Sequence, residues 1–159
     1  SQLQITAIRK APVETIPALY WWAANFGRYL TTKPVLTRIE SREIIETAMH
    51  RIATLDEDYY YGGPTRFFGT FYSRLPGVPL DRAKSNFDQS LSDSPDYLGT
   101  RVLRARYYHT KLGNRDLFEE DLNYVINADP SVLPDAMPEN LYEQEKAREL
   151  LKHTSILFE

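Results

Sequence analysis

Three segments of the chain share one spacing of residues, and this repetition constrains the fold more than any other feature. Each copy has four key positions. The second follows the first by four residues, the third follows the second by three, and the fourth follows the third by five. The copies are Ile45-Met49-Ile52-Glu57, Ala83-Phe87-Ser90-Pro95 and Phe118-Leu122-Val125-Pro130. Steps of four and three put the first three positions on one helix face, and a proline then starts the next turn. The copies lie about 35 to 38 residues apart, which predicts a repeated helical unit.

The rest of the chain is also dominated by helical periodicity, and alternating strand patterns are nearly absent. Thr15 is a candidate cap and Pro17 fits a first helical turn. Gly62-Gly63-Pro64 cannot continue a preceding helix, and the glycines there suit a positive φ or a close helix approach. We predict seven helices and no strand: Thr15 to Leu30, Ser41 to Leu55, Thr65 to Arg74, Asp81 to Ser92, Tyr97 to Lys111, Arg115 to Ala128 and Glu139 to Phe158.

The predicted fold is all-α. The repeat spacing is similar to that of the tetratricopeptide repeat, whose period is about 34 residues. Phe68, Gly69 and Tyr72 supply the aromatic and glycine positions of a first helix. We therefore expect a tetratricopeptide-like solenoid of helical pairs in which the last helix is a cap. Residues 1–159 would form a single repeat domain, and the start at Ser1 without Met indicates the C-terminal part of a longer precursor.

Composition disfavours several classes of function. The net charge is −3 and there is no cysteine, so we expect no nucleic-acid binding, no thiol chemistry and no cysteine-based metal site. Glu46 and His50 make one ligand-like step of four residues, but a zinc-protease helix needs a second histidine. We predict no metal, no cofactor and no catalytic residues, and we expect the chain not to be an enzyme.

Twenty aromatic residues, 11 of them Tyr, are an unusual number for a chain of this length. Tyr20, Trp21 and Trp22 are consecutive, and at about 100° per residue they cannot all enter one core stripe. At least one ring must therefore face a neighbouring repeat, a pocket or a partner, so the rings either pack between repeats or at least one of them forms part of a binding surface. We predict that some of a set of seven rings line an apolar groove or channel. The set is Tyr20, Trp21, Trp22, Phe68, Tyr72, Tyr107 and Tyr108.

Basic and aromatic residues are interleaved between positions 101 and 111. Arg101 and Arg104 are three residues apart and suit an anion-facing patch, while Arg104 and Tyr108 are four apart and suit a stacked pair. A solvated helix face or intramolecular salt bridges would explain the same arginines equally simply. Three arginines are few beside the roughly six to ten phosphate contacts of a DNA-binding protein. The candidates are therefore an organic anion, an acidic partner or a structural role.

Several short motifs, in their order along the chain, carry a narrower resemblance that covers about residues 16 to 158. They are Pro17-Ala18-Leu19-Tyr20-Trp21, Tyr60-Tyr61-Gly62-Gly63-Pro64, Leu75-Pro76-Gly77, Tyr97-Leu98-Gly99-Thr100, Asn114-Arg115-Asp116-Leu117-Phe118, Asn127-Ala128-Asp129-Pro130 and Glu143-Gln144-Glu145-Lys146-Ala147. With these motifs the chain resembles the TatT-type T component of the tetratricopeptide-repeat-associated TRAP transporters, a family of periplasmic and often lipid-anchored proteins.

The resemblance implies a periplasmic accessory protein of a TRAP-type transport system. Its implied partner is the TRAP solute-binding protein, and a small apolar or organic-acid ligand is a further candidate. The site residues expected for these contacts are Tyr20, Trp21, Trp22, Phe68, Tyr72, Arg101, Arg104, Tyr107 and Tyr108. The resemblance also allows a homo-oligomer. The alternative is a general tetratricopeptide-like scaffold that binds proteins and has no role in transport.

Overall fold

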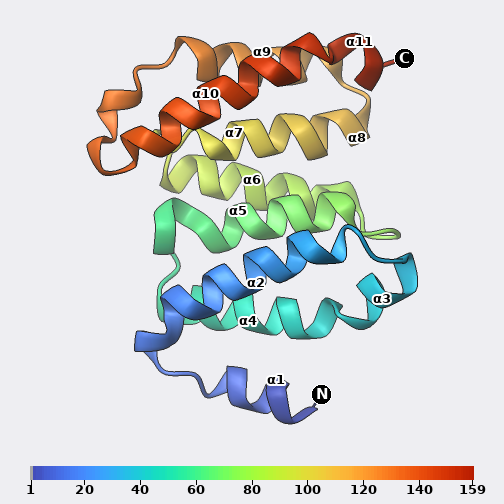
Figure 1. Cartoon of the computed structure of the whole chain (residues 1–159), viewed down its shortest axis with the longest axis vertical. Helices are drawn as coiled ribbons and strands as arrows, with labels where there is room; N and C mark the ends of the chain where they lie inside the picture. Colours follow the sequence, from blue (N-terminus) through green and yellow to red (C-terminus); the bar gives the residue numbers. More distant parts are fainter. Residues whose placement is uncertain (1) are drawn as a thin grey trace. The chain divides into compact units, whose positions relative to one another are not determined.

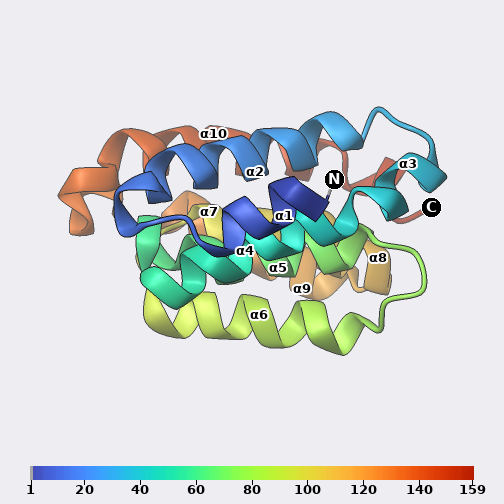
Figure 2. The same cartoon turned by 90° about the horizontal axis from the view of Figure 1, so that it is seen from below.

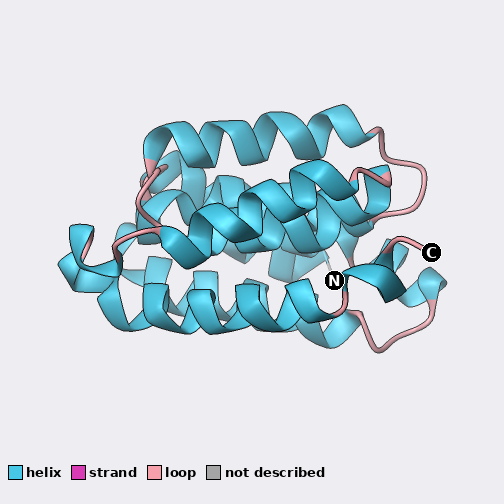
Figure 3. Cartoon of the chain, turned by 90° about the horizontal axis from the view of Figure 1, so that it is seen from above, coloured by secondary structure: helices cyan, strands magenta, loops and turns pink. Residues whose placement is uncertain are grey.

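The computed structural model describes residues 2–159, and this part of the chain is helical with no strand (Figures 1 and 3). The prediction of an all-α fold is therefore confirmed. The elements are α1 (Gln2–Arg9), η1 (Val13–Thr15), α2 (Ile16–Leu30), α3 (Val35–Glu40), α4 (Arg42–Leu55), α5 (Tyr59–Arg74), α6 (Leu80–Asp93), α7 (Gly99–Leu103), η2 (Arg104–His109), α8 (Thr110–Leu112), α9 (Arg115–Asn127), η3 (Pro130–Val132), η4 (Pro134–Ala136), α10 (Met137–Lys152) and α11 (Thr154–Leu157).

The main helices begin and end close to the predicted positions, with a few differences. Two helices, α1 and α3, were not predicted, and they are eight and six residues long. The predicted last helix is divided at His153 into α10 and α11. Pro17 does lie in the first turn of α2, but Thr15 makes no side-chain capping bond.

The chain divides into two compact units, residues 1–67 and 68–159. In the first unit, α1 and α2 both pack against α4 (Figure 2). Ile45, Met49 and Ile52 on α4 are fully buried, as the repeated spacing predicts. Ala23 and Leu30 of α2 are also buried in this unit.

A left-handed stretch of backbone lies in the first unit near the start of α5. The φ values are 52° at Tyr60, 58° at Tyr61 and 68° at Gly62, and two consecutive tyrosines in this region are strained. The buried guanidinium of Arg66 donates to the carbonyl oxygens of Tyr60 and Tyr61 at 2.9 and 2.7 Å. These charge-assisted bonds offset part of the strain and hold the turn in place.

The two glycines of this turn have different roles, and both were expected. Gly62 adopts the positive φ. Gly63 allows a close approach, because a Cβ at this position would lie 2.8 Å from the ring of Tyr20. Tyr20 in turn contacts the rings of Tyr59 and Tyr60, with centroids 5.2 and 5.8 Å apart. The turn therefore lies against a cluster of rings around the buried Tyr20.

In the second unit, the other two copies of the repeated spacing also point into the core. Ala83, Phe87 and Ser90 are 0% exposed, and so are the corresponding residues of α9, which are Phe118, Leu122 and Val125. A Cβ on Gly69 would lie 2.8 Å from the ring of Phe87, so the glycine allows that ring to approach its helix. The α9 positions form one apolar cluster with Leu98, which precedes α7, and with Val102 of α7, Ala105 of η2 and Ala147 of α10.

The predicted helix Tyr97 to Lys111 is not a uniform α-helix. It consists of α7, the π-helical segment η2 and the short α8. The backbone N–H and the hydroxyl of Thr110 both donate to the carbonyl of Ala105, five residues earlier. Short π segments of this kind are rare and change which side chains share a helix face.

Candidate functional site

An open groove of about 470 Å³ lies in the second unit beside α9. Its walls are the segment that precedes α7, the outer face of α9 and the loop that follows α9. The lining residues are Asp96, Leu98, Glu120, Asn123, Tyr124, Asn127, Ala128, Asp129 and Val132. Three carboxylates, two amides and one tyrosine thus surround a small apolar surface, and no basic side chain lines the groove.

Two buried amides of α10 hold both walls of the groove. The side-chain oxygen of Asn140 accepts from the N–H of Leu98 at 2.9 Å, and its Nδ2 donates to the carbonyl of Asp96 at 2.9 Å. Gln144 Nε2 lies 3.0 Å from the carbonyl oxygen of Val125 and 2.8 Å from that of Ala128. One helix therefore fixes the start of α7 and the end of α9, so the groove is preformed.

The tyrosine of the groove wall is supported by an arginine. Tyr124 is exposed, and the guanidinium carbon of Arg101 lies 3.8 Å from its ring centroid. This cation–π contact restricts the ring without covering it completely. Two acidic groups of the groove, Asp96 and Glu120, form no ion pair within residues 2–159. The groove thus offers a rigid aromatic surface together with carboxylates outside any ion pair of residues 2–159, and the charge of Glu120 also attracts Arg104.

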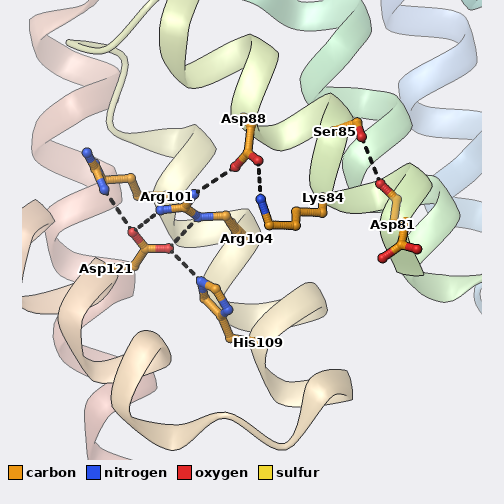
Figure 4. A network of polar contacts seen from close by, with 8 residues as sticks. All are labelled: Asp81, Lys84, Ser85, Asp88, Arg101, Arg104, His109 and Asp121. Carbon is orange, nitrogen blue, oxygen red and sulfur yellow. Dashed lines mark hydrogen bonds and ion pairs between the residues drawn. The ribbon is translucent and has the colours of Figure 1, made fainter. Parts of the chain in front are cut away.

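Arg101 is itself held by a buried charge cluster that adjoins the groove wall (Figure 4). Asp121 is 2% exposed and accepts from Arg101 at 2.9 Å and from Arg104 through two bonds of 2.7 Å. His109 Nε2 lies 3.1 Å from the same carboxylate, and Arg104 also reaches Asp88 of α6 at 3.4 Å. The cluster thus links α7 and η2 to Asp121 of α9, and Arg104 also links α6 through Asp88.

The electrostatics of this cluster favour a charged Asp121. Burial alone raises the pKa of the carboxyl, but its hydrogen bonds to Arg104, His109 and Arg101 and the charge of Arg104 outweigh burial. The pKa of Asp121 falls from 3.8 to about 2. Burial lowers the pKa of Arg104, but its hydrogen bonding to Asp121 and the charges of Asp121, Asp88 and Glu120 outweigh burial and raise the pKa. Both partners therefore stay ionised near neutral pH, as expected for a paired buried charge.

The structure places the predicted arginines in this cluster. Arg101 and Arg104 do lie together, but their guanidinium groups bind Asp121. The expected stack of Arg104 on Tyr108 is not formed, because Arg104 turns toward Asp121 while Tyr108 packs on Phe87 at 6.4 Å. Intramolecular salt bridges, one of the two readings left open by the sequence, are what the structure contains.

The predicted rings of the second unit are mostly packed. Phe68 and Tyr72 are buried and stack on each other with centroids 5.5 Å apart. The Tyr72 hydroxyl accepts from Arg82 at 3.0 Å. Tyr108 is buried, and Tyr107 is half-buried with the guanidinium carbon of Arg74 4.9 Å from its centroid. Within this unit these rings do not line the groove.

In the first unit the three consecutive rings have different surroundings. Tyr20 is buried in the aromatic cluster, whereas Trp21 and Trp22 are 46% and 40% exposed. Trp21 touches Tyr60 edge to face at 5.1 Å, and Trp22 stacks on Phe26 at 5.5 Å. As expected from their spacing, the three rings do not share one core stripe. The two tryptophans are the members of the predicted set with the most accessible surface in this unit.

Sequence reasoning missed the residues that form and fix the groove. Tyr124, Asn140 and Gln144 were not among the site candidates. One signal was present: two of the motifs quoted for the resemblance, around Asn127-Ala128-Asp129 and Glu143-Gln144, contain groove residues or their supports. No group of three or more potential metal ligands occurs within residues 2–159.

These features define an all-α protein in which a helical framework presents a fixed, acidic groove. The sequence model of the family described as TRAP transporter T-component matches residues 3–158. The chain therefore belongs to the TRAP transporter T-component family, and the resemblance read from its motifs is confirmed. That family is an accessory component of a transport system. Among the curated proteins compared with the chain, none matches.

Membership of a transport family raises the question of a membrane span. Among residues 2–159, no helix combines the length and the apolar composition needed to cross a membrane.

Proposed function

We propose that the chain is the periplasmic T component of a TRAP-type system and that it binds the solute-binding protein of that system. The family match over residues 3–158 is the observation that carries this proposal. We further propose that the helices form a tetratricopeptide-like solenoid of helical pairs within a single repeat domain. The full burial of all nine stripe positions supports this, and so does the approach of the Phe87 ring to Gly69.

The groove beside α9 is the contact surface that we propose for this partner. Tyr124 offers an exposed ring of limited freedom, which is typical of residues that dominate binding energy at interfaces. Asp96 and Glu120 add negative charge that would attract a basic segment. A preformed groove also lowers the ordering cost of association. The complementary surface of the partner would therefore carry lysine or arginine beside an apolar contact.

The groove suits some ligands better than others. Its carboxylates, Asp96, Glu120 and Asp129, would repel an organic acid. A small apolar ligand would find only Leu98, Tyr124 and Val132 as apolar walls. A basic protein segment uses both kinds of surface, so the groove favours the solute-binding protein over either small ligand.

Arg101 and Arg104 take a positioning role in this proposal. Since Asp121 binds both guanidinium groups, they have little free charge to steer a partner. Arg101 holds the ring of Tyr124 in place, and Arg104 helps to keep the charge cluster around Asp121 rigid. Steering falls instead to the carboxylates of the groove.

The test is a titration of the purified chain with the solute-binding protein encoded nearest to it, at two salt concentrations. We expect Tyr124→Ala to raise the dissociation constant by at least about tenfold, which is typical of the loss of an anchoring ring. The double variant Asp96→Asn/Glu120→Gln should slow association mainly at low salt. The matched control is Tyr142→Ala, which removes an exposed ring of α10 outside the groove and should change neither value.

Two results would contradict the proposal. Unchanged affinity in the Tyr124→Ala variant would move the contact away from the groove while leaving the partner in place. Absence of binding at both salt concentrations, by this chain and by the full-length protein, would replace the transport role with that of a general protein-binding scaffold.

A further inference from the structure

One stretch of the first unit has a charge pattern unlike the rest of the chain. Residues 16–39, which form α2, the following loop and most of α3, contain Arg28, Lys33 and Arg38 and not one Asp or Glu. The whole chain has 22 acidic residues and a net charge of −3. A run of 24 residues with only positive charge is therefore a local reversal of sign within an acidic protein.

The same stretch exposes large apolar side chains at high density. Leu36 is 67% exposed, and five others in this stretch are also well exposed. These are Trp21, Trp22, Tyr29, Val35 and Ile39. Few surfaces expose so many rings and aliphatic chains over two consecutive helices, and exposed apolar side chains at this density mark an interaction surface.

The aromatic part of this surface is ordered along α2. Trp22, Phe26 and Tyr29 follow each other at steps of four and three. Their rings stack with centroids 5.5 and 6.3 Å apart. Lys33 Nζ then lies 4.5 Å from the centroid of Tyr29. Rings and a cation thus form a continuous ladder toward α3, and two of its three rings, Trp22 and Tyr29, are exposed.

The positive groups in this stretch are not neutralised within the unit. Arg28 and Lys33 form no ion pair within residues 2–159, whereas Arg42, just beyond the stretch, is paired with Glu46 at 3.1 Å. Their charge is therefore available to an external partner.

We propose that residues 16–39 dock on the surface of an anionic lipid bilayer. Tryptophan and tyrosine favour the boundary between headgroups and acyl chains, where an apolar ring and a polar edge are both accommodated. Exposed Leu36 and Ile39 would enter the acyl boundary, while Arg28 and Lys33 would meet anionic headgroups. Residues 16–39 present no carboxylate that an anionic surface would repel, and the first one beyond the stretch is Glu40 at the end of α3.

This docking is independent of the binding of a solute-binding protein. The groove lies in residues 96–132, and the docking stretch lies in residues 16–39. No spanning helix is needed, since the helices would lie in the interface. The inference therefore concerns a second surface that the proposed function does not use.

The chain provides its own site-specific reporter. Its two tryptophans, Trp21 and Trp22, both belong to the docking stretch. The chain is mixed with vesicles of equal parts phosphatidylglycerol and phosphatidylcholine, or of phosphatidylcholine alone. We expect a blue shift of tryptophan emission with the anionic vesicles, and quenching when the acyl chains are brominated. Both signals should weaken at high salt, because attraction to anionic headgroups is screened.

Two variants and a control test which residues carry the docking. Arg28→Gln/Lys33→Gln should weaken partition to anionic vesicles by roughly fivefold for each charge removed, or about 25-fold together. Leu36→Ser/Ile39→Ser should weaken partition at all salt concentrations. Leu141→Ser/Tyr142→Ser removes equally exposed apolar groups from α10 and should leave partition unchanged.

Three outcomes would overturn the proposal. The first is tryptophan emission that does not respond to anionic vesicles. The second is partition that is unaffected by both docking variants. The third is tryptophan emission that shifts only when the chain self-associates or when the solute-binding protein is added. Light scattering, which reports the mass of the complex, identifies this case. The third outcome would assign the stretch to a protein interface.

Discussion

Replacing Asp121 by asparagine removes the negative charge that pairs with both Arg101 and Arg104, and this lowers the free energy of unfolding. The carboxylate is 2% exposed and accepts three hydrogen bonds of 2.7 to 2.9 Å from the two guanidinium groups. Removal of one partner of a buried ion pair leaves charge without compensation, which typically costs about 3 to 5 kcal/mol. We expect the free energy of unfolding of Asp121→Asn to fall by that amount at pH 7.

The pH dependence of this loss gives a sharper test. The folded-state pKa of Asp121 is about 2, against an ordinary value of 3.8. Because the pKa is lowered by folding, the stabilisation is fully present well above pH 3.8 and is lost as the pH falls through the folded-state value. The shift corresponds to about 2 kcal/mol, of which about half is lost by pH 3. The difference between the wild type and Asp121→Asn should therefore narrow by about 1 kcal/mol between pH 7 and pH 3.

Urea unfolding followed by circular dichroism at 222 nm measures this difference. Helix content reports on both units, including residues 68–159, whereas the tryptophans report only on the first unit. The matched control is Asp88→Asn, which removes a partly exposed partner of Arg104 and should change stability by less than about 1 kcal/mol. Parallel pH profiles for the wild type and Asp121→Asn would refute the reasoning, since Asp121 would then have the same pKa in both states.

Other perturbations test the packing. Phe87→Ala and Leu122→Ala should each lower the free energy of unfolding by roughly 2 to 5 kcal/mol, because both side chains are fully buried; urea unfolding measures this, and losses below about 1 kcal/mol would contradict the assignment to the core. Gly63→Ala should cost about 1 to 3 kcal/mol, since its Cβ would meet the Tyr20 ring at 2.8 Å; a thermal melt that matches the wild type would show that the ring can move away.

The parts of the fold that depend on short-range periodicity could be predicted from the sequence. Steps of three and four residues identified Ile45, Phe87 and Leu122 as core positions, and all three are fully buried. The local chemistry of Gly62-Gly63-Pro64 likewise indicated a positive φ and a close approach. Such features follow from backbone sterics within a few residues, so no knowledge of distant segments was needed.

The short helices could not be predicted for a physical reason. α3 spans six residues, and its side chains Val35, Leu36 and Ile39 are exposed. A helix of this length has no apolar face turned toward a core, and isolated short helices have little stability of their own. The periodic pattern that reveals longer helices is therefore absent.

The groove depended on long-range contacts that single-sequence reasoning does not contain. Asn140 reaches Asp96 and Leu98, which lie more than 40 residues earlier in the chain. Gln144 reaches the end of α9 in the same way. In the sequence both amides appear on a polar helix and are indistinguishable from solvated side chains. Only the packing of α10 on α9 gives them buried partners.

The charge cluster shows how a local change of helix type can redirect a site. In a regular α-helix, residues 104 and 109 would point about 140° apart, so Arg104 would pair with Tyr108 as the sequence suggests. In the π-helical segment the N–H of Thr110 bonds five residues back, to Ala105. This wider turn brings residues five apart toward one face, and Arg104 and His109 both reach Asp121. Because of this wider turn, the predicted arginines bind Asp121 inside the protein, and Arg101 supports the ring of Tyr124. The charged side chains that line the groove are therefore all acidic.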